Sequence, residues 1–137
     1  MLSAKKNSQT FSYRIYYEDT DAGGVVYYAN YLKFYERART DFLRELNISQ
    51  FELASEKKII FVVRKCEIEY HHPTRLDDMI EVDVRVSEIN KATLTMMQKI
   101  TKSSQLISQL KVVLVCLNSQ TFKPIRLPQN LLDLIYV

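Results

Sequence analysis

The sequence predicts an α+β fold in which an antiparallel sheet of about five strands wraps around one long helix. One strand-like segment precedes one long helical segment, and four long β-rich segments then follow one another. This order lacks the alternation of strands and helices that builds a parallel sheet. The 137 residues are 47% hydrophobic and 26% charged, the balance of a globular chain with one core, so a single domain over residues 1–137 is expected.

The long helix is predicted from the spacing of apolar residues in the first third of the chain. Between Tyr31 and Leu46, apolar side chains recur at three- and four-residue steps, which aligns them along one face of a helix of about four turns. Asn30 is the candidate N-cap of this helix. A short helical turn over residues 26–29 is the alternative start.

A shorter helix and the strands are predicted from local signals. Ser49 is a capping residue and Glu52 lies three positions later, which predicts a second helix that ends near Lys57. The first strand is expected in the alternating aromatic segment at residues 11–17. The four later strands are expected at residues 59–72, 79–89, 92–102 and 106–118. Strands of this length present more apolar surface than one helix covers, so self-association is expected.

The composition excludes several classes of function. The longest apolar run, at residues 112–117, is far shorter than the ~20 residues of a membrane-spanning helix, so no membrane span is expected. The N-terminal residues lack the apolar stretch of a signal peptide, which favours a cytoplasmic protein. The net charge of +3 is small and the basic residues are scattered, so no nucleic-acid partner is expected.

The cysteines and histidines predict neither a disulfide nor a metal site. Cys66 and Cys116 lie in strand-like segments and form no C-x-x-C pair, so two buried free thiols are expected. His71 and His72 are the only histidines, and neighbouring side chains of a strand point to opposite faces, which prevents them from binding one metal together. We therefore expect no metal and no cofactor.

The segment YEDTDAGGVVYYANY carries the strongest functional signal. Asp19 and Asp21 precede the glycines Gly23 and Gly24, which let the backbone approach a ligand, and a helix start follows. A helix start presents unpaired N–H groups that polarise a carbonyl oxygen, and a nearby carboxylate can then attack that carbonyl or activate water. One aspartate is expected to face the ligand while the other holds the turn. The alternative is that both only shape a tight turn.

The longer segment YYEDTDAGGVVYYANYLKFYERAR resembles the active-site region of the 4-hydroxybenzoyl-CoA thioesterase family, and most closely its Tol-Pal-associated acyl-CoA thioesterase branch. The resemblance continues through FVVRKCEIEYHHPTRLDDMIEV and covers most of the chain. It implies a hotdog fold, in which the sheet wraps the long helix and two protomers join their sheets as a homodimer, which often pairs into a homotetramer. It also implies an acyl-CoA substrate and hydrolysis of the thioester bond.

The resemblance also implies the roles of residues in this segment. Asp21 falls on the catalytic carboxylate, as nucleophile or general base, and Tyr28 on the amide that polarises the thioester at the helix start. Gly24 and Val26 are the candidates for contact with substrate. The branch usually carries histidine where this chain has Tyr28. Any catalytic role of that histidine therefore cannot operate here. The hydroxybenzoyl-CoA enzyme resembles this chain in having tyrosine at this position. Most of the other tyrosines are expected in the core.

Two charged residues outside this segment have competing interpretations. Another group of hotdog thioesterases uses a glutamate on the long helix, which makes Glu36 a catalytic alternative, but pairing with Arg37 or Arg39 is favoured. The strand alternation places Arg64 on the apolar face that holds Cys66, where a buried or interface ion pair is favoured. Contact with substrate is the alternative for Arg64.

Three classes of function compete. Hydrolysis of acyl-CoA is favoured, with Arg64, Lys65, Lys91 or Arg126 as candidates to bind the CoA phosphates. A hotdog dehydratase would act on acyl carrier protein and would need a histidine near the site, and the segment has none. The third alternative is a non-catalytic module that binds acyl-CoA or acyl carrier protein in connection with the cell envelope. The presence of both aspartates and both glycines disfavours it.

Overall fold

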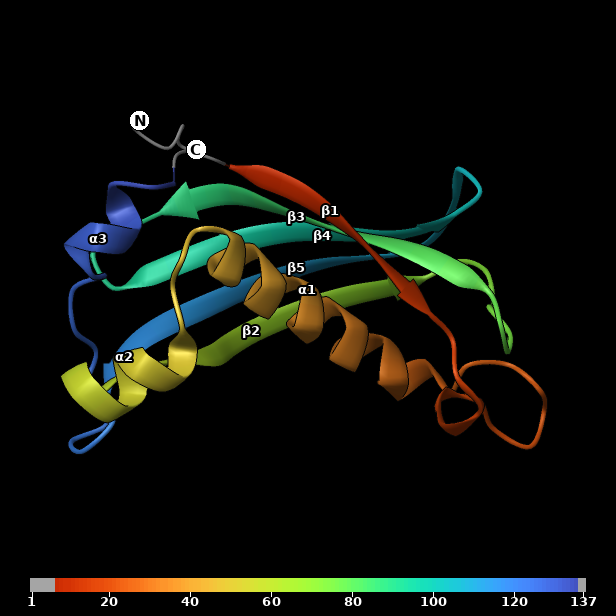
Figure 1. Ribbon diagram of the computed structural model, residues 1–137, viewed down its shortest axis with the longest axis horizontal. Coiled ribbons are helices and arrows are strands. Elements are labelled where there is room, and N and C mark those ends of the chain that lie inside the picture. Colours follow the sequence, from red (N-terminus) through yellow and green to blue (C-terminus); the bar gives the residue numbers. More distant parts are fainter. Residues whose placement is uncertain (1–6, 136–137) are drawn as a thin grey trace.

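The structure is a computed structural model that describes residues 7–135. Its strands are β1 (Ser8–Arg14), β2 (Ile59–Tyr70), β3 (Met79–Ile89), β4 (Thr93–Lys102) and β5 (Gln105–Asn118). Its helices are α1 (Tyr31–Glu45), α2 (Gln50–Lys57) and α3 (Gln129–Leu132), and the short 3-10 helices η1 (Tyr17–Asp19) and η2 (Tyr28–Asn30) precede α1. The antiparallel sheet, in the order β1-β3-β4-β5-β2, curves around α1 (Figure 1). The predicted α+β class is confirmed.

The core lies between α1 and the inner face of the sheet. The helix buries Tyr31, Phe34, Tyr35, Ala38 and Phe42 of the predicted apolar stripe, together with Leu43. Leu46, the last residue of the predicted stripe, follows the helix and is also buried. On the sheet, alternate residues of β3 face this stripe, and Val82 and Val84 are fully buried. The Tyr35 hydroxyl donates a hydrogen bond of 2.8 Å to the Ser108 hydroxyl of β5, which fixes the position of the helix over the sheet.

The helix starts agree with the sequence in part. The Ser49 hydroxyl accepts a hydrogen bond of 3.2 Å from the Glu52 N–H, so the predicted cap of α2 is confirmed. Asn30 directly precedes α1, but its side chain does not cap the helix and instead donates to the Asp19 carbonyl oxygen at 3.0 Å. The helical turn ahead of α1 covers Tyr28–Asn30 rather than residues 26–29.

Strand β2 forms one edge of the sheet and contains a β-bulge. Val63 pairs with Leu114 and Lys65 pairs with Val113, so Arg64 is the extra residue. The bulge reverses which side chains face α1: odd-numbered residues do so before it and even-numbered residues, such as Cys66, after it. The strict alternation that placed Arg64 on the apolar face of Cys66 therefore does not hold along β2.

The position of β2 at the edge also changes the expected burial. Arg64 is exposed and forms no ion pair with any described residue, so an interface ion pair or a ligand contact of Arg64 stays a prediction. Cys66 is exposed rather than buried, because no further strand lies beside it, whereas Cys116 of the inner strand β5 is buried as predicted. Within residues 7–135, no helix is both long and apolar enough to cross a membrane.

Candidate active site

The segment between β1 and α1 folds back on itself as a short hairpin that contains Asp21. Thr20 and Val26 pair as an antiparallel bridge, and the Asp21 N–H donates to the Val25 carbonyl oxygen at 2.9 Å. The Gly24 N–H donates to the Asp21 carbonyl oxygen at 3.0 Å, and Gly24 has a φ of +80°, a conformation that residues with a side chain rarely adopt. The hairpin therefore depends on glycine at position 24.

The hairpin is anchored to the loop between β2 and β3. Val25 bridges to Arg75, and the Val26 N–H donates to the carbonyl oxygen of the fully buried Thr74 at 2.8 Å. The Thr74 hydroxyl and the hydroxyl of Tyr31, the first residue of α1, lie 2.7 Å apart in a hydrogen bond. The start of α1, the hairpin and the β2–β3 loop are therefore held together.

The structure separates the two aspartates. Asp19 is 6% exposed, and its Oδ2 accepts a hydrogen bond of 2.8 Å from the Tyr16 N–H at the start of η1. Its carbonyl oxygen accepts from the Tyr27 N–H at 3.1 Å. Asp21 is exposed, and its Oδ1 accepts from the Gly23 N–H at 2.8 Å, while its Oδ2 has no hydrogen-bond partner among the described residues. Asp19 holds the turn, and Asp21 keeps one oxygen free for a ligand.

Tyr28 begins the helical segment that continues into α1. As the first residue of η2, it has no intrahelical acceptor for its N–H, and no other backbone group within residues 7–135 accepts from it. The preceding Tyr27 makes no side-chain cap. The Tyr28 N–H is therefore available to a ligand at a helix start, where the helix dipole favours negative charge.

An open groove of about 260 Å³ lies against Tyr28. Its lining residues are Val26, Tyr28, Tyr31, Tyr70, His71, His72 and Pro73. The Tyr28 and Tyr70 rings meet edge to face, with centroids 5.8 Å apart, and the Tyr31 and Tyr70 centroids are 5.9 Å apart. Tyr70 has no sequence signal that sets it apart from other strand tyrosines, and only the fold brings it to the helix start.

The expectation that most tyrosines lie in the core is wrong for the described part of the chain. Among these tyrosines only Tyr31 and Tyr35 are buried. The exposed ones are Tyr16, Tyr17, Tyr27, Tyr28 and Tyr70, which lie on the hairpin segment or at the end of β2 beside it. The aromatic side chains thus gather around the candidate site.

The phenols beside the groove stay protonated at neutral pH. The hydrogen bond with Tyr28 raises the pKa of the Tyr27 hydroxyl, and the negative charge of Asp21 adds to this effect. Burial raises the pKa of the Tyr70 hydroxyl. Burial also raises the pKa of the Tyr31 hydroxyl, although the hydrogen bonds with Thr74 act in the opposite direction. These tyrosines therefore offer neutral hydrogen-bonding groups rather than anions.

The two histidines bond to their neighbours. His71 Nε2 lies 3.5 Å from Glu69 Oε2, and His72 Nδ1 lies 3.1 Å from the Leu106 carbonyl oxygen. They also line the groove at Tyr28, a placement that the sequence did not indicate. No group of three or more potential metal ligands occurs within residues 7–135.

Glu36 lies apart from Asp21, in the middle of α1. Its Oε1 accepts a hydrogen bond of 2.8 Å from the Thr40 hydroxyl, and it forms no ion pair with Arg37 or Arg39 in the described chain, so the predicted pairing is wrong. Glu36 borders a cavity of about 120 Å³ between α1 and β2. Its position eight residues beyond Tyr28 places it ~12 Å further along the helix axis.

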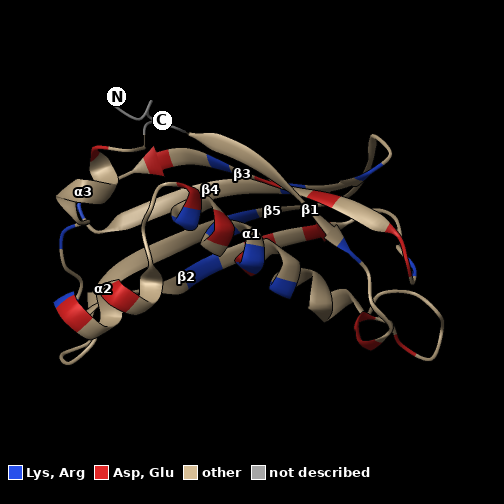
Figure 2. Ribbon diagram, viewed as in Figure 1, with Lys and Arg blue, Asp and Glu red and all other residues tan. Residues whose placement is uncertain are grey.

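The basic residues proposed for CoA phosphates do not gather in one place. Lys91, in the β3–β4 turn, and Arg126, which precedes α3, lie at the end opposite the hairpin, whereas Arg64 and Lys65 lie along β2 (Figure 1). Arg75 is exposed and adjoins the hairpin at Val25, a position that sequence reasoning missed. In Figure 2, acidic and basic residues are interspersed along α1 and the strands.

Comparison with known proteins identifies the class of protein. Residues 16–135 match the family model described as the Thioesterase-like superfamily. The crystal structure of a probable thioesterase from Bartonella henselae superposes with a TM-score of 0.84 and 36% identity over 88% of this chain and 99% of that chain. The 4-hydroxybenzoyl-CoA thioesterase of a Pseudomonas species shares the fold, with a TM-score of 0.86 and 18% identity over 94% of this chain and 99% of that chain. The chain belongs to the Thioesterase-like superfamily, and the predicted hotdog fold is confirmed.

Within this family the chain is similar to bacterial YbgC proteins. The acyl-CoA thioesterase YbgC of Haemophilus influenzae is 42% identical over 90% of this chain and 91% of its own length. The acyl-CoA thioester hydrolase YbgC of Escherichia coli is 44% identical over 86% of this chain and 88% of its own length. The family predicted from the DTDAGG segment is therefore confirmed.

The structural role of Asp19 predicts a loss of stability when its carboxylate is removed. Asp19→Ala leaves the Tyr16 N–H without its partner and removes the buried carboxylate that holds the turn, so the free energy of unfolding should fall by about 1–3 kcal/mol. Glu18→Ala, at an exposed neighbour, should change it by less than about 0.5 kcal/mol. Urea denaturation followed by circular dichroism measures both, and equal stability of the two variants would contradict the role of Asp19.

Proposed function

We propose that this protein hydrolyses acyl-CoA thioesters to the free acid and CoA, with Asp21 as the catalytic carboxylate and the Tyr28 N–H as hydrogen-bond donor to the thioester carbonyl. The observation that carries the proposal is the placement of the Asp21 carboxylate and the Tyr28 N–H in a chain of the thioesterase superfamily. A carboxylate with a free oxygen follows β1, and a free N–H opens the helical segment at the other end of the same short hairpin.

The chemistry follows from these two groups. The carbonyl oxygen accepts from the Tyr28 N–H, and the negative charge that develops on this oxygen is stabilised by the helix start. The Gly23 N–H orients the Asp21 carboxylate through Oδ1, which leaves Oδ2 to act. Oδ2 either attacks the carbonyl carbon and expels the CoA thiolate, after which water hydrolyses the acyl-enzyme anhydride, or takes a proton from the water that attacks.

The groove at Tyr28 supports a ligand of this kind. Its wall consists largely of aromatic rings, and the raised pKa values of Tyr31 and Tyr70 favour the neutral form of these two hydroxyls. A neutral wall does not repel a carbonyl oxygen that gains negative charge. A CoA substrate also fits the proposed cytoplasmic location, and Arg75 beside the hairpin and Arg64 and Lys65 along β2 are candidates to meet its phosphates. Acyl carrier protein is the alternative carrier of the acyl group.

The catalytic assignment of Asp21 is tested by removing its charge. Asp21→Asn keeps the shape of the side chain and its exposed position, so folding should be unchanged while kcat falls by at least ~100-fold, since the attacking or proton-accepting oxygen is lost. Release of CoA thiol from a series of acyl-CoAs measures this loss. Glu18→Gln, an exposed acid on the same segment, is the matched control and should keep wild-type kcat. Activity of Asp21→Asn within a few-fold of wild type would refute the assignment.

The role of the Tyr28 backbone predicts opposite results for two substitutions. Tyr28→Phe keeps the N–H and should retain turnover within roughly tenfold, a loss of at most ~1.4 kcal/mol in transition-state stabilisation. Tyr28→Pro removes the N–H at a position where helices accept proline, so the fold should remain and turnover should be abolished. Measurements of kcat decide, with circular dichroism as the control for folding. An inactive Tyr28→Phe variant together with an active Tyr28→Pro variant would assign the catalytic role to the Tyr28 hydroxyl instead of the N–H.

We infer a homodimer, or a tetramer built from it, that forms through β2. This strand is 12 residues long, and its outer edge has no partner strand in the sheet. Two large apolar side chains of the strand are exposed, Val63 at 52% and Tyr70 at 42%. A long edge with unpaired N–H and C=O groups favours pairing with a second strand, and a two-fold axis pairs identical edges. Such pairing would place a second protomer beside Tyr70 and close the open groove.

The oligomeric state is tested by light scattering at micromolar concentration. Wild type should have two or four times the 16.1 kDa mass of the chain. Val63→Glu introduces a charge at the paired edge and should shift the population towards monomer, whereas Phe122→Glu, at another exposed apolar residue, should not. A monomeric wild-type protein, or equal masses for the two variants and wild type, would contradict pairing through β2.

A further inference from the structure

The groove at Tyr28 is lined by a histidine whose ring has one nitrogen engaged and the other free. His72 Nδ1 lies 3.1 Å from the Leu106 carbonyl oxygen. A carbonyl oxygen only accepts hydrogen bonds, so Nδ1 carries the proton and donates it to this bond. The neutral ring then has its lone pair on Nε2, which makes no hydrogen bond with a described residue. His72 therefore brings a free proton acceptor to the lining of the groove.

The backbone register places His72 opposite Tyr28. Val25 and Arg75 form an antiparallel bridge. Three residues further along the first segment is Tyr28, and three residues back along the second segment is His72. Both residues line the groove, together with Tyr70, whose ring meets that of Tyr28 edge to face. The free nitrogen of His72 and the free N–H of Tyr28 therefore belong to the same small site.

One of the two chemical routes open to Asp21 needs a second base. If Asp21 Oδ2 attacks the thioester, CoA leaves as the thiolate and the acyl group stays on Asp21 as an anhydride. The carboxylate is then part of the anhydride and cannot take a proton from the water that hydrolyses it. This second step requires another proton acceptor beside the acyl carbonyl.

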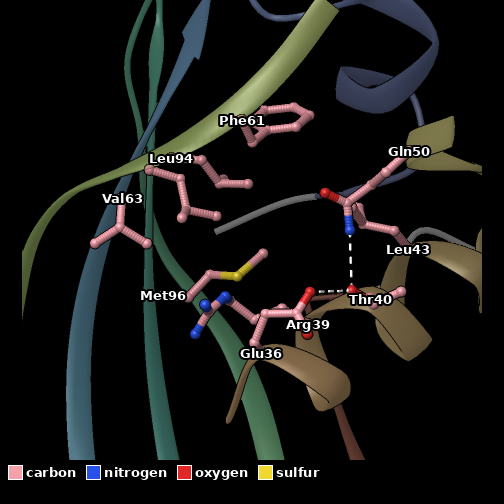
Figure 3. Close-up of a pocket in the computed structure, with 10 residues that line it drawn as sticks. Glu36, Arg39, Thr40, Leu43, Gln50, Phe61, Val63, Leu94 and Met96 are labelled. Atoms are coloured by element: carbon pink, nitrogen blue, oxygen red, sulfur yellow. Dashed lines mark hydrogen bonds between the residues drawn. The ribbon is translucent and has the colours of Figure 1, made fainter. Parts of the chain in front are cut away.

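Other groups near the site do not fit this role. No carboxylate is among the described residues that line the groove. Glu36 borders the separate cavity between α1 and β2, where the Thr40 hydroxyl donates to its Oε1 (Figure 3). Burial raises the pKa of the Tyr31 and Tyr70 hydroxyls, so these phenols stay protonated and accept a proton poorly.

The neighbouring His71 is the alternative acceptor. It also lines the groove, but its Nε2 lies 3.5 Å from Glu69 Oε2, so this nitrogen is directed to the end of β2. His72 forms no ion pair with a described residue. Of the two Nε2 atoms, only that of His72 is free for water within the described chain.

We propose that His72 is the catalytic base of the second step, in which water hydrolyses an acyl group held on Asp21. The proposal rests on the proposed thioesterase function and selects the nucleophilic route for Asp21. In the first step, Asp21 Oδ2 bonds the acyl carbon, and the carbon–sulfur bond breaks to release the CoA thiolate. The Tyr28 N–H holds the acyl carbonyl oxygen in this step and in the next, so the acyl carbon stays at the groove.

In the second step, water attacks the acyl carbon while His72 Nε2 takes one of its protons. The bond between the acyl carbon and Asp21 then breaks, which releases the acid and returns Asp21 as a carboxylate. The imidazolium gives its proton through solvent to the CoA thiolate, so acid and CoA thiol are the products and both side chains regain their starting forms. The groove of about 260 Å³ has room for this water, which takes about 30 Å³ in the liquid.

The substitution His72→Asn separates the base from the structural bond. The asparagine amide nitrogen takes the place of Nδ1 and can donate to the Leu106 carbonyl oxygen, whereas nothing replaces Nε2. Steady-state kcat on the best acyl-CoA should therefore fall by ~100-fold or more. Asp77→Asn is the control, because Asp77 is exposed on the same β2–β3 loop, outside the groove lining, and asparagine tolerates its φ of +69°. This control should keep wild-type kcat.

Rapid mixing and added imidazole show which step is lost. In His72→Asn the attack by Asp21 still operates, so CoA release should begin with a burst of one equivalent per chain, followed by a slow phase. In His72→Ala, free imidazole can occupy the space of the missing ring and supply the acceptor. Imidazole should therefore raise kcat of His72→Ala by about tenfold or more and leave that of the wild type unchanged.

Several results would overturn the proposal. Wild-type kcat in His72→Asn refutes His72 as a base and leaves the thioesterase function intact. A loss of kcat in His72→Asn without a burst, or a loss in His72→Ala that imidazole does not restore, shows that the ring does not act in the second step. A burst in His71→Asn beside wild-type kcat in His72→Asn assigns the base to His71. Absence of CoA release by the wild type from every acyl-CoA refutes the function itself.

Discussion

Thr74, in the loop between β2 and β3, holds the three segments that make up the candidate site. Its carbonyl oxygen accepts from the hairpin at Val26, and its hydroxyl and N–H bond the Tyr31 hydroxyl at 2.7 and 3.2 Å. Because Thr74 is fully buried, each of these bonds is protected from competing water. These bonds hold the hairpin and the start of α1 against the β2–β3 loop, and the bridges of Val25 to Arg75 and of Thr20 to Val26 add to them.

The edge strand β2 connects the carbonyl site with the cavity on α1. Its end at Tyr70 forms a wall of the groove beside Tyr28, and its beginning at Phe61 forms a wall of the cavity. Within one protomer these two places lie far apart, at opposite ends of the strand. The bulge at Arg64 lies between the two halves and turns Val63 and Cys66 to the same face. In this account, the strand that forms a wall of the groove also carries the edge proposed for assembly.

The sequence predicted the elements well, because each has a periodic or local signal. The stripe from Tyr31 to Leu46 and the Ser49 cap need no tertiary information. The family resemblance identified the hairpin, and the different burial of its two aspartates agrees with the different roles expected for them. The strict alternation along β2 and the burial of Cys66 were wrong, because periodicity reveals neither a bulge nor which strand forms the edge. The tyrosines around the groove were missed because aromatic residues look alike in a core and at a site. The catalytic roles within the hairpin segment stay predictions.

The most direct measurement is a crystal structure of Asp21→Asn with an intact acyl-CoA bound. Slow turnover should trap the substrate, and the account predicts that the thioester carbonyl oxygen lies within hydrogen-bond distance of the Tyr28 nitrogen, ~2.7–3.2 Å, with the substituted side chain at position 21 facing the carbonyl carbon. A thioester bound away from Tyr28, for example with its carbonyl beside Glu36, would contradict the account.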